Sequence, residues 1–436
     1  MATRSMWERG LDQPWDRREL MAGLAATVAG VVSPRIARAD GRQSLKLTAV
    51  SGTIELDPAQ PRTQIASLQG PTAAVRIKRG GELDLLLRND LPAPLALSLV
   101  GIDGAGSAEP LARRAAVAAG AEESFTVPLR RAGTFLCDAR LLGAAIRPLP
   151  LIIEDDAAAA VDRDEVFLVE DWRLQPDRSL AAPGSATAAL PAIYTVNGRV
   201  APEITLRPNQ RLRFRFINGC QRKVIALKIE GHDVRVMALD GAPAEPFPAG
   251  NGALVLAPGG RADVDIDATA PPGSTASILL HDGNDARPIA RLVTSREPPV
   301  RSTPLPPAAA LLANDLPAQL DLKGALRVDI AVSGGEAGWV MPVDFGTAAA
   351  PAFRAKRGRT VVLAVANRGG VAAVLHLHGH HFRLLDRLDD GWKPFWLDTL
   401  AVEPGQTQRI AFAAEHSGRW LIEAMATDWA ASRLVR

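Results

Sequence analysis

Short runs of alternating apolar and polar residues, separated by glycine and proline, recur along almost the whole chain. They include residues 45–50, 75–78, 83–89, 123–127, 211–216, 262–267, 360–365 and 407–412. Alternation with a period of two is typical of half-buried β-strands, and no long helical period appears beyond residue 39. The pattern therefore predicts an all-β protein. Within it, we expect the runs at 75–78 and 83–89, joined by Gly80 and Gly81, to form a hairpin.

One of these runs has a charged face. Arg211, Arg213 and Arg215 alternate with leucine and phenylalanine. Charged residues that alternate along a strand are most simply exposed to water on its outer face. We therefore expect a half-buried strand that carries three solvated guanidinium groups.

The runs fall into three blocks of similar length, and each block suits one β-sandwich. A leader precedes the blocks, and a segment rich in proline and alanine separates the second block from the third. The expected parts are a leader at 1–39, domains at 40–158, 159–300 and 321–436, and a linker at 301–320.

Residues 1–39 carry the three features of an export signal. Arg17 and Arg18 form a twin arginine, an apolar run follows at 21–32, and residues 37–39, Ala-Arg-Ala, form a cleavage site. The apolar run is too short to span a bilayer. The leader resembles the twin-arginine (Tat) signal, which implies recognition by the Tat translocase and a periplasmic location. We expect cleavage after residue 39, which leaves no membrane anchor; an uncleaved anchor is the alternative.

The composition narrows the choice of partners. The chain has 50 Lys and Arg and 48 Asp and Glu, and removal of the leader's six basic and four acidic residues leaves 44 of each. A formally neutral mature chain argues against nucleic acid as a partner. The two cysteines, Cys137 and Cys220, allow either one disulfide bridge or two free thiols.

Four of the seven histidines lie between residues 376 and 381. Strand alternation would place His376, His378 and His380 on one face and His381 on the other. Two imidazoles on one face can begin a metal site, because imidazole is the commonest metal ligand in proteins. The alternative is that these histidines are ordinary residues of the core or the surface.

Short motifs in all three blocks resemble those of the multicopper oxidases. In the third block they are His376-Leu377-His378-Gly379-His380, Asp398-Thr399, Gly405 and Gly418-x-Trp420. In the second block they are Val196-Asn197-Gly198, Phe216-Ile217-Asn218, Asp240-Gly241 and Pro258-Gly259-Gly260-Arg261. The first block matches more weakly, through Asn89 and Gly133-Thr134-Phe135. The resemblance implies three consecutive cupredoxin-like domains, each a Greek-key β-sandwich, after the export signal.

In active multicopper oxidases, four short motifs supply the copper ligands. When the four motifs are aligned with this sequence, most ligand positions hold a residue other than the usual copper ligand. These residues are Ser98, Val100, Asp138, Arg140, Ala373, Glu423, Ala424, Met425, Trp429 and Leu434. His376 and His378 remain as candidate metal ligands, with Glu423 and Met425 as weaker ones. A blue copper centre needs a thiolate and two imidazoles, and the two cysteines, which lie in other blocks, are not expected to substitute.

The resemblance thus implies an oxidase fold without oxidase chemistry. The leader, the fold and the missing ligands together resemble a copper-free class of the family, periplasmic proteins that act with the bacterial division machinery. This predicts a non-catalytic scaffold or stabilising factor that has no cofactor and has protein partners in the periplasm, among them components of the division septum. The alternative is a copper-binding protein or copper-dependent oxidoreductase with a residual site at His376 and His378.

The resemblance also predicts what fills the former copper volume. In the family fold, the ligand motif that here holds Asp138 and Arg140 faces the motif that here holds Glu423 and Met425. The two motifs meet at the interface of domains 1 and 3. The residues that stand there, Asp138, Arg140, Glu423 and Met425, should converge on the two histidines. Because a guanidinium suits a carboxylate and buried polar groups need partners, we expect Arg140 to pair with Glu423, Asp138 or both. His376 and His378 should then form local hydrogen bonds.

Replacing Arg17 and Arg18 together by lysine should leave the full-length precursor in the cytoplasm, because paired arginines form the address that the Tat receptor reads. Cell fractionation that separates precursor from processed protein measures this outcome. Normal processing of the double variant, or loss of export only when the Sec route is blocked, would count against a Tat leader.

Overall fold

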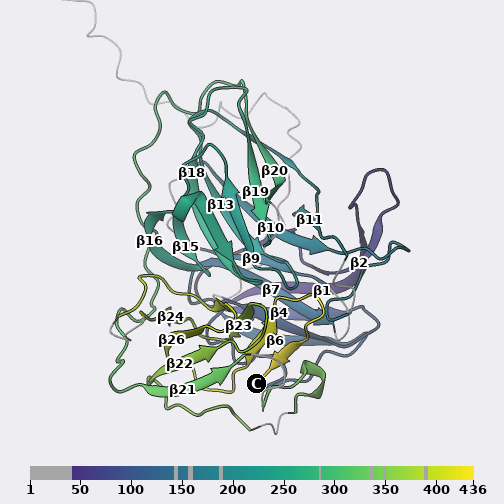
Figure 1. Cartoon of the computed structure of the whole chain (residues 1–436), viewed down its shortest axis with the longest axis vertical. Helices are drawn as coiled ribbons and strands as arrows, with labels where there is room; N and C mark the ends of the chain where they lie inside the picture. The colour runs from purple at the N-terminus through teal and green to yellow at the C-terminus, as the bar shows by residue number, and fades with distance from the viewer. Residues whose placement is uncertain are drawn as a thin grey trace, which may run out of the picture. The chain divides into compact units, whose positions relative to one another are not determined.

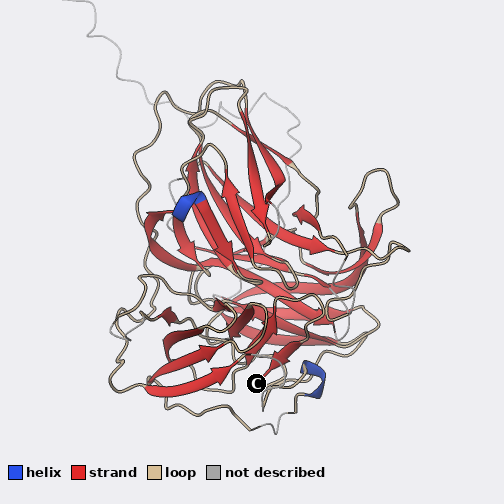
Figure 2. Cartoon of the chain, in the orientation of Figure 1, coloured by secondary structure: helices blue, strands red, loops and turns tan. Residues whose placement is uncertain are grey.

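The computed structural model describes residues 42–141, 146–155, 161–185, 190–283, 286–332, 338–346, 350–386 and 391–436. This part of the chain forms strands β1 to β28 and two short 3-10 turns, η1 (Gly250–Gly252) and η2 (Pro342–Asp344) (Figure 1, Figure 2). The expectation of an all-β fold is therefore confirmed. The expected leader lies outside the described residues, and no helix within them is long and apolar enough to cross a membrane.

The first set of strands forms two sheets around one apolar core. Its strands are β1 (Arg42–Ile54), β2 (Thr63–Gln69), β3 (Val75–Lys78), β4 (Glu82–Asn89), β5 (Leu95–Val100), β6 (Glu122–Pro128), β7 (Gly133–Leu141), β8 (Ile146–Arg147) and β9 (Leu149–Glu154). One sheet has the order β6-β4-β1-β2-β8 and the other the order β3-β9-β7-β5. The predicted hairpin is wrong, because β3 pairs with β9 whereas β4 pairs with β1 and β6. Gly80 and Gly81, both with positive φ, instead carry the chain from one sheet to the other.

The second set repeats the two-sheet arrangement around its own core. Its strands are β10 (Arg163–Trp172), β11 (Ile193–Val196), β12 (Glu203–Leu206), β13 (Arg211–Asn218), β14 (Ile225–Ile229), β15 (Arg235–Leu239), β16 (Ala242–Pro248), β17 (Ala253–Leu256), β18 (Arg261–Asp267), β19 (Thr275–His281) and β20 (Ala286–Thr294). The sheets have the orders β11-β10-β13-β18-β15-β16 and β12-β20-β19-β14-β17.

The third set follows a stretch, 301–320, in which the structure has no strand. Its strands are β21 (Leu326–Ala331), β22 (Thr360–Ala366), β23 (Ala373–Leu377), β24 (Arg383–Leu384), β25 (Thr399–Val402), β26 (Thr407–Ala413), β27 (Ile422–Ala426) and β28 (Arg433–Val435). They form the sheets β21-β22-β26-β24 and β25-β23-β27-β28 around a third core. Among the described strands, no sheet combines members of two sets.

A buried asparagine occupies the same place in each set: Asn89 at the end of β4, Asn218 at the end of β13 and Asn367 just after β22. Asn218 accepts the backbone N–H of Cys220 at 3.0 Å and donates to the carbonyls of Lys223 and Leu256 at 2.9 and 2.8 Å. Asn89 and Asn367 form the same pattern of bonds. One amide side chain thus ties a strand end to a distant loop in every sandwich, which satisfies backbone groups that would otherwise be buried without partners.

A glycine in that distant loop completes each asparagine turn. Gly120, Gly259 and Gly405 have φ values of 73°, 83° and 72°, and each donates its N–H to the backbone carbonyl of the asparagine. Glycine adopts this left-handed conformation without a steric penalty. The three sandwiches therefore share one turn chemistry, although no short repeat is visible in the sequence.

The charged face of β13 is buried, so the prediction of three solvated arginines is wrong. Strand β18 pairs with β13 in a register that sets an aspartate opposite each arginine: Arg211 opposite Asp267, Arg213 opposite Asp265, and Arg215 opposite Asp263. Arg213 and Asp265, both buried, form two hydrogen bonds of 2.9 and 3.0 Å. The neutralising strand lies about fifty residues away in the chain, so local alternation alone could not distinguish a paired face from a solvated one.

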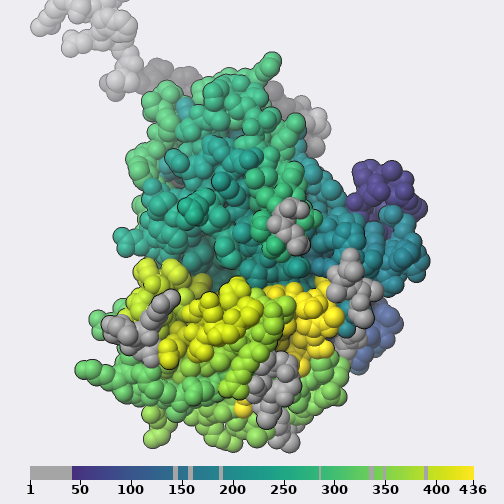
Figure 3. Space-filling view, viewed as in Figure 1, coloured from purple at the N-terminus to yellow at the C-terminus, as the bar shows by residue number. Residues whose placement is uncertain are grey.

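Arg261, at the start of β18, connects all three sets of strands. Its guanidinium donates to both carboxylate oxygens of Asp398 in the third set at 2.9 and 2.6 Å. It also donates to the carbonyl of Thr134 in the first set at 3.1 Å and to that of Asp240 in its own set at 2.7 Å. On the face shown in Figure 3, the teal residues of the second set lie directly against the yellow residues of the third. Motifs from three separate blocks therefore meet at one side chain.

Asn218→Asp should lower the free energy of unfolding of the second sandwich by about 3 kcal/mol, because the carbonyls of Lys223 and Leu256 would lose their buried donor. Denaturant unfolding followed by fluorescence measures the change. Asn251→Asp is the matched control, since Asn251 is exposed and the charge change is identical. Equal stability of the two variants would show that the asparagine turn does not hold the sandwich together.

Candidate metal centre

His376 and His378 lie side by side between the first and third sets of strands. His376 is on β23, the strand between β25 and β27, and His378 follows the strand's last residue. Both side chains are buried, and their ring centroids are 4.7 Å apart. The structure therefore brings these two candidate residues together.

The expected alternation does not continue to His380 and His381. Strand β23 ends at Leu377, and Gly379, with φ of 68°, turns the chain. The His380 ring instead packs against Phe412 and Trp420, at 5.4 and 5.3 Å between ring centroids. His381 contacts the Asp103 carboxylate at 2.7 Å. Since the turn interrupts the period of two, the sequence pattern overstated the number of histidines on one face.

Arg140 lies between two carboxylates, as the sequence predicted. Arg140 and Asp138 are on β7 of the first set, and Glu423 is on β27 of the third, where it pairs in register with His376. Arg140 donates to Asp138 at 3.1 and 2.9 Å, and a further hydrogen bond joins it to Glu423. Burial by itself would lower the pKa of Arg140, but the charges of Glu423 and Asp138 raise it. The guanidinium is therefore firmly charged.

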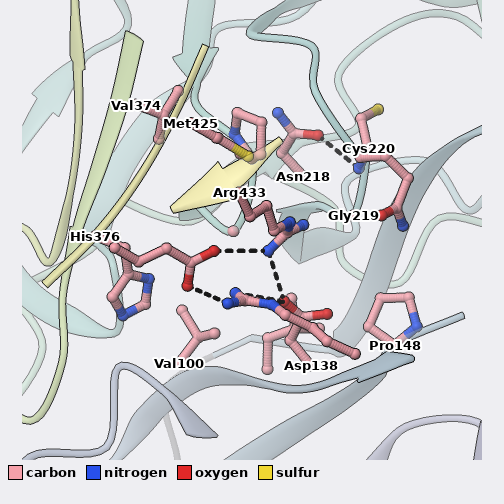
Figure 4. A pocket seen from close by; sticks show the side chains of 16 residues that line it. Val100, Asp138, Pro148, Asn218, Gly219, Cys220, Val374, His376, Met425 and Arg433 are labelled. Atoms are coloured by element: carbon pink, nitrogen blue, oxygen red, sulfur yellow. Dashed lines mark hydrogen bonds and ion pairs between the residues drawn. The ribbon is translucent and has the colours of Figure 1, made fainter. Parts of the chain in front are cut away.

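A second arginine, Arg433 on β28, completes this arrangement. Its Nη1 donates to Glu423 at 3.1 Å and to Asp138 at 3.3 Å, and Figure 4 shows it reaching towards Asp138 with His376 on the far side of the pocket. Asp138, Arg140, Glu423 and Arg433 form what we term the charged cluster. The cavity that remains beside the charged cluster has a volume of about 20 Å³. Sequence reasoning missed Arg433, because only the pairing of β28 with β27 brings it here.

His378 is held by carboxylates on both ring nitrogens. Its Nδ1 is 2.9 Å from Glu109 and its Nε2 is 3.5 Å from Glu423. Burial by itself would lower the pKa of His378, but the Glu109 and Glu423 carboxylates raise it to about 9. The ring is therefore a cation at neutral pH. Glu109 lies in a loop that no sequence motif singled out.

His376 differs from its neighbour. Burial first, and then the charge of His378, lower its pKa to about 3, so the ring is neutral. Within the described part of the chain it has no hydrogen bond, although it lines the pocket. The expectation of local hydrogen bonds thus holds for His378 but is wrong for His376.

The remaining predicted positions fall into two groups. Ala373, Ala424 and Leu434 meet in the apolar core of the third set, whereas Trp429 packs under the guanidinium of Arg173 from the second set at 4.6 Å. Three others line the pockets around the charged cluster: Ser98, Val100 and Met425. The ten positions therefore do not form one polar site.

Both cysteines are buried free thiols, so no bridge joins them. Burial raises the pKa of Cys137 to about 12 and that of Cys220 well above its ordinary value. Cys220 lines the same pocket as His376, but on its opposite side (Figure 4). Its sulfur, however, lies 3.9 Å from the carbonyl of Val169 and is protonated.

In this arrangement the candidate ligands His378 and Glu423 already have partners among the protein's own side chains. Copper needs unprotonated imidazoles or a thiolate, but His378 is a cation and both of its nitrogens are engaged. Arg140 and Arg433 bring two more positive charges to Glu423. Among the described residues, no three His, Cys, Asp or Glu side chains are grouped so that they could hold a metal.

Comparison with known proteins agrees with this architecture. Two family models, both described as multicopper oxidase, match residues 163–279 and 319–435, together more than half of the chain. A multi-copper oxidase from Pseudomonas thermotolerans has the same fold, with a TM-score of 0.76 over 90% of this chain and 98% of that one at 22% identity. Lac15 from a marine microbial metagenome gives a TM-score of 0.71 over 88% and 96% of the two chains at 24% identity.

Two curated relatives point to the same family. A laccase from Haloferax volcanii is 30% identical over 285 residues, 58% of this chain and 48% of the laccase. The multicopper oxidase MmcO of Mycobacterium tuberculosis is 27% identical over 252 residues, 52% of this chain and 47% of that protein. The chain thus spans about half the length of these relatives. The matched domains and the three cupredoxin-like sandwiches together place the chain in the multicopper oxidase superfamily.

Proposed function

We propose that this protein is a non-catalytic member of the multicopper oxidase superfamily. In this proposal it has lost the copper sites and acts in the periplasm as a scaffold or stabilising factor. The observation that carries the proposal is the charged cluster, in which Arg140 and Arg433 lie against Asp138 and Glu423. Side chains that join the first and third sandwiches occupy the volume at which the family resemblance places copper.

The electrostatics of the site support this proposal. A copper ion beside Glu423 would face Arg140, Arg433 and the His378 cation. At separations near 4 Å each like-charge pair costs about 4 kcal/mol at the effective dielectric constant of a protein surface. Metal binding would therefore have to displace at least one guanidinium, and that would leave the guanidinium buried without its carboxylate.

The choice of compartment and partner follows from the leader and the family resemblance. A Tat signal delivers folded proteins to the periplasm, and the copper-free proteins that this chain resembles act with the division machinery. We therefore propose protein partners in the periplasm, with components of the division septum as the first to test. Co-purification of the tagged mature protein from crosslinked periplasm, with and without septal proteins, tests this assignment.

A second candidate function is a copper-binding protein or oxidoreductase with a residual site at His376 and His378. One observation favours it: the neutral ring of His376 lines the pocket and has no hydrogen bond among the described residues. Against it stands the protonated His378, which must lose its proton before it can bind a metal. Cu²⁺ or Zn²⁺ should raise the melting temperature of the wild type, but not of His376→Ala, if this second candidate is correct.

The mature protein should show no oxidation of phenols or of cuprous ion after expression with added copper. It should also lack a blue absorption band, because the positions of the thiolate and its two imidazoles hold Ala424, Ala373 and Trp429. An active laccase assayed in parallel is the control. Copper-dependent turnover that disappears in His376→Ala would refute the non-catalytic assignment.

Arg140→Ala should lower the free energy of unfolding by about 3 kcal/mol, the lower end of the range for breaking a buried ion pair, because Arg433 still contacts both carboxylates. Thermal and denaturant unfolding measure the change. Arg291→Ala is the matched control, since Arg291 pairs with Glu203 at 2.7 Å while 59% exposed, and such pairs contribute little. If Arg140→Ala is as stable as this control, the charged cluster does not hold the sandwiches together.

A further inference from the structure

A second cavity, of about 260 Å³, adjoins the charged cluster. All three sets of strands contribute to it. Its walls are largely apolar and include Pro110, Leu111, Ile146, Met341, Leu421 and Val435. The polar residues that reach it are Ser98, Asp138, Arg140, Gln221, Arg222, His378, Ser432 and Arg433. Apolar walls with a few placed polar groups are typical of sites for small organic molecules.

Arg222 is the arginine in this cavity that has no ion pair among the described residues, although the charges of Glu423 and Asp171 act on it from farther away. It is only 4% exposed, yet no carboxylate of the described residues lies within ion-pair distance of it. Its Nε donates to the carbonyl of Ala431 at 2.9 Å and its Nη1 to that of Gln221 at 2.7 Å. Its Nη2 has no hydrogen bond within the described part of the chain. A buried guanidinium without a counter-ion destabilises the folded protein. An anion bound next to Arg222 would remove this destabilisation.

The other cations of the cavity already have partners. Arg140 and Arg433 share Asp138 and Glu423, and His378 contacts Glu109. Ser98, which is 2% exposed, provides a hydroxyl with no hydrogen bond among the described residues. The cavity therefore has one cation without an ion pair and one hydroxyl without a hydrogen bond among the described residues, and its walls are largely apolar. That combination suits a single negative charge joined to an apolar group.

We propose that this cavity binds a small monocarboxylate with an apolar tail. The carboxylate pairs with Nη2 of Arg222, because planar guanidinium groups match carboxylates. The tail packs against the apolar wall around Met341 and Leu421. A dianion such as phosphate suits the site less well, since only one of its cations has no ion pair among the described residues and much of the wall is apolar.

Binding at this place would stabilise the assembled protein. The lining residues come from three sandwiches, for example Ser98 from the first, Arg222 from the second and Leu421 from the third. A ligand that binds only the assembled form raises its stability in proportion to the logarithm of ligand concentration. The cavity thus gives the protein a site at which a small metabolite can strengthen the contacts between domains.

The test uses the mature protein and hexanoate as the probe. Thermal unfolding and titration calorimetry should show a melting temperature that rises with hexanoate concentration and saturable binding with one site. Hexanamide, which keeps the tail but lacks the charge, hexylammonium, which reverses it, and inorganic phosphate, which lacks the tail, should each bind at least about tenfold more weakly. Equal responses to hexanoate and hexanamide, or no response to hexanoate, would overturn the proposal.

Two kinds of variant locate the site. Arg222→Gln should abolish the response to hexanoate, whereas the exposed control Arg291→Gln should keep it. Val343, which lines the cavity and is 55% exposed, offers a test that leaves the interior unchanged. Val343→Glu should weaken hexanoate binding and Val343→Lys should preserve or strengthen it, because the two side chains place opposite charges at the cavity. An unchanged affinity in Arg222→Gln, or equal affinities in the two Val343 variants, would overturn the assignment.

Discussion

The arrangement of the three sandwiches depends on the hydrogen bonds of Arg261, whose guanidinium is fully buried. It binds Asp398 of the third set through two hydrogen bonds and reaches Thr134 of the first. A charge in that position is tolerable only while every partner stays in place, since loss of one would strand the other in a medium of low dielectric. The sandwiches are thus held in one relative position by electrostatics at their centre, in addition to apolar contact.

The charged cluster follows the same rule at the neighbouring interface. Arg140 and Asp138 on β7 meet Glu423 on β27 and Arg433 on β28. Active members of the family place metal ions between the first and third domains; here, in our proposal, ion pairs occupy that place. Such ion pairs are strong because both charges lie inside the protein, where the dielectric constant is low. Arg222, which lines the cavity beside this cluster, has no ion pair among the described residues.

Features that depend on local sequence could be predicted from the sequence, whereas most features that depend on contacts between distant segments could not. The strands, the third-block histidine pair and the contact of Arg140 with carboxylates were predictable, because a period of two and the family motifs encode them. The supposed hairpin, the solvated face of β13 and the common face of His376, His378 and His380 were not. In the first two cases a strand distant in the chain decided the outcome, namely β9 beside β3 and the aspartates of β18. In the third case the left-handed turn at Gly379, within the histidine segment itself, ended the strand.

The sequence by itself determined that the chain folds as successive β-sandwiches of the multicopper oxidase type, and through the family resemblance it predicts Ala424, Ala373 and Trp429 at the ligand positions of a blue copper. Those properties depend on side-chain chemistry and local periodicity, which the order of residues specifies directly. Only the tertiary structure decided that Arg433 joins Arg140 and that Arg222 has no ion-pair partner among the described residues. Whether a buried arginine has an ion-pair partner depends on distances between segments far apart in the chain. Only the folded structure sets those distances.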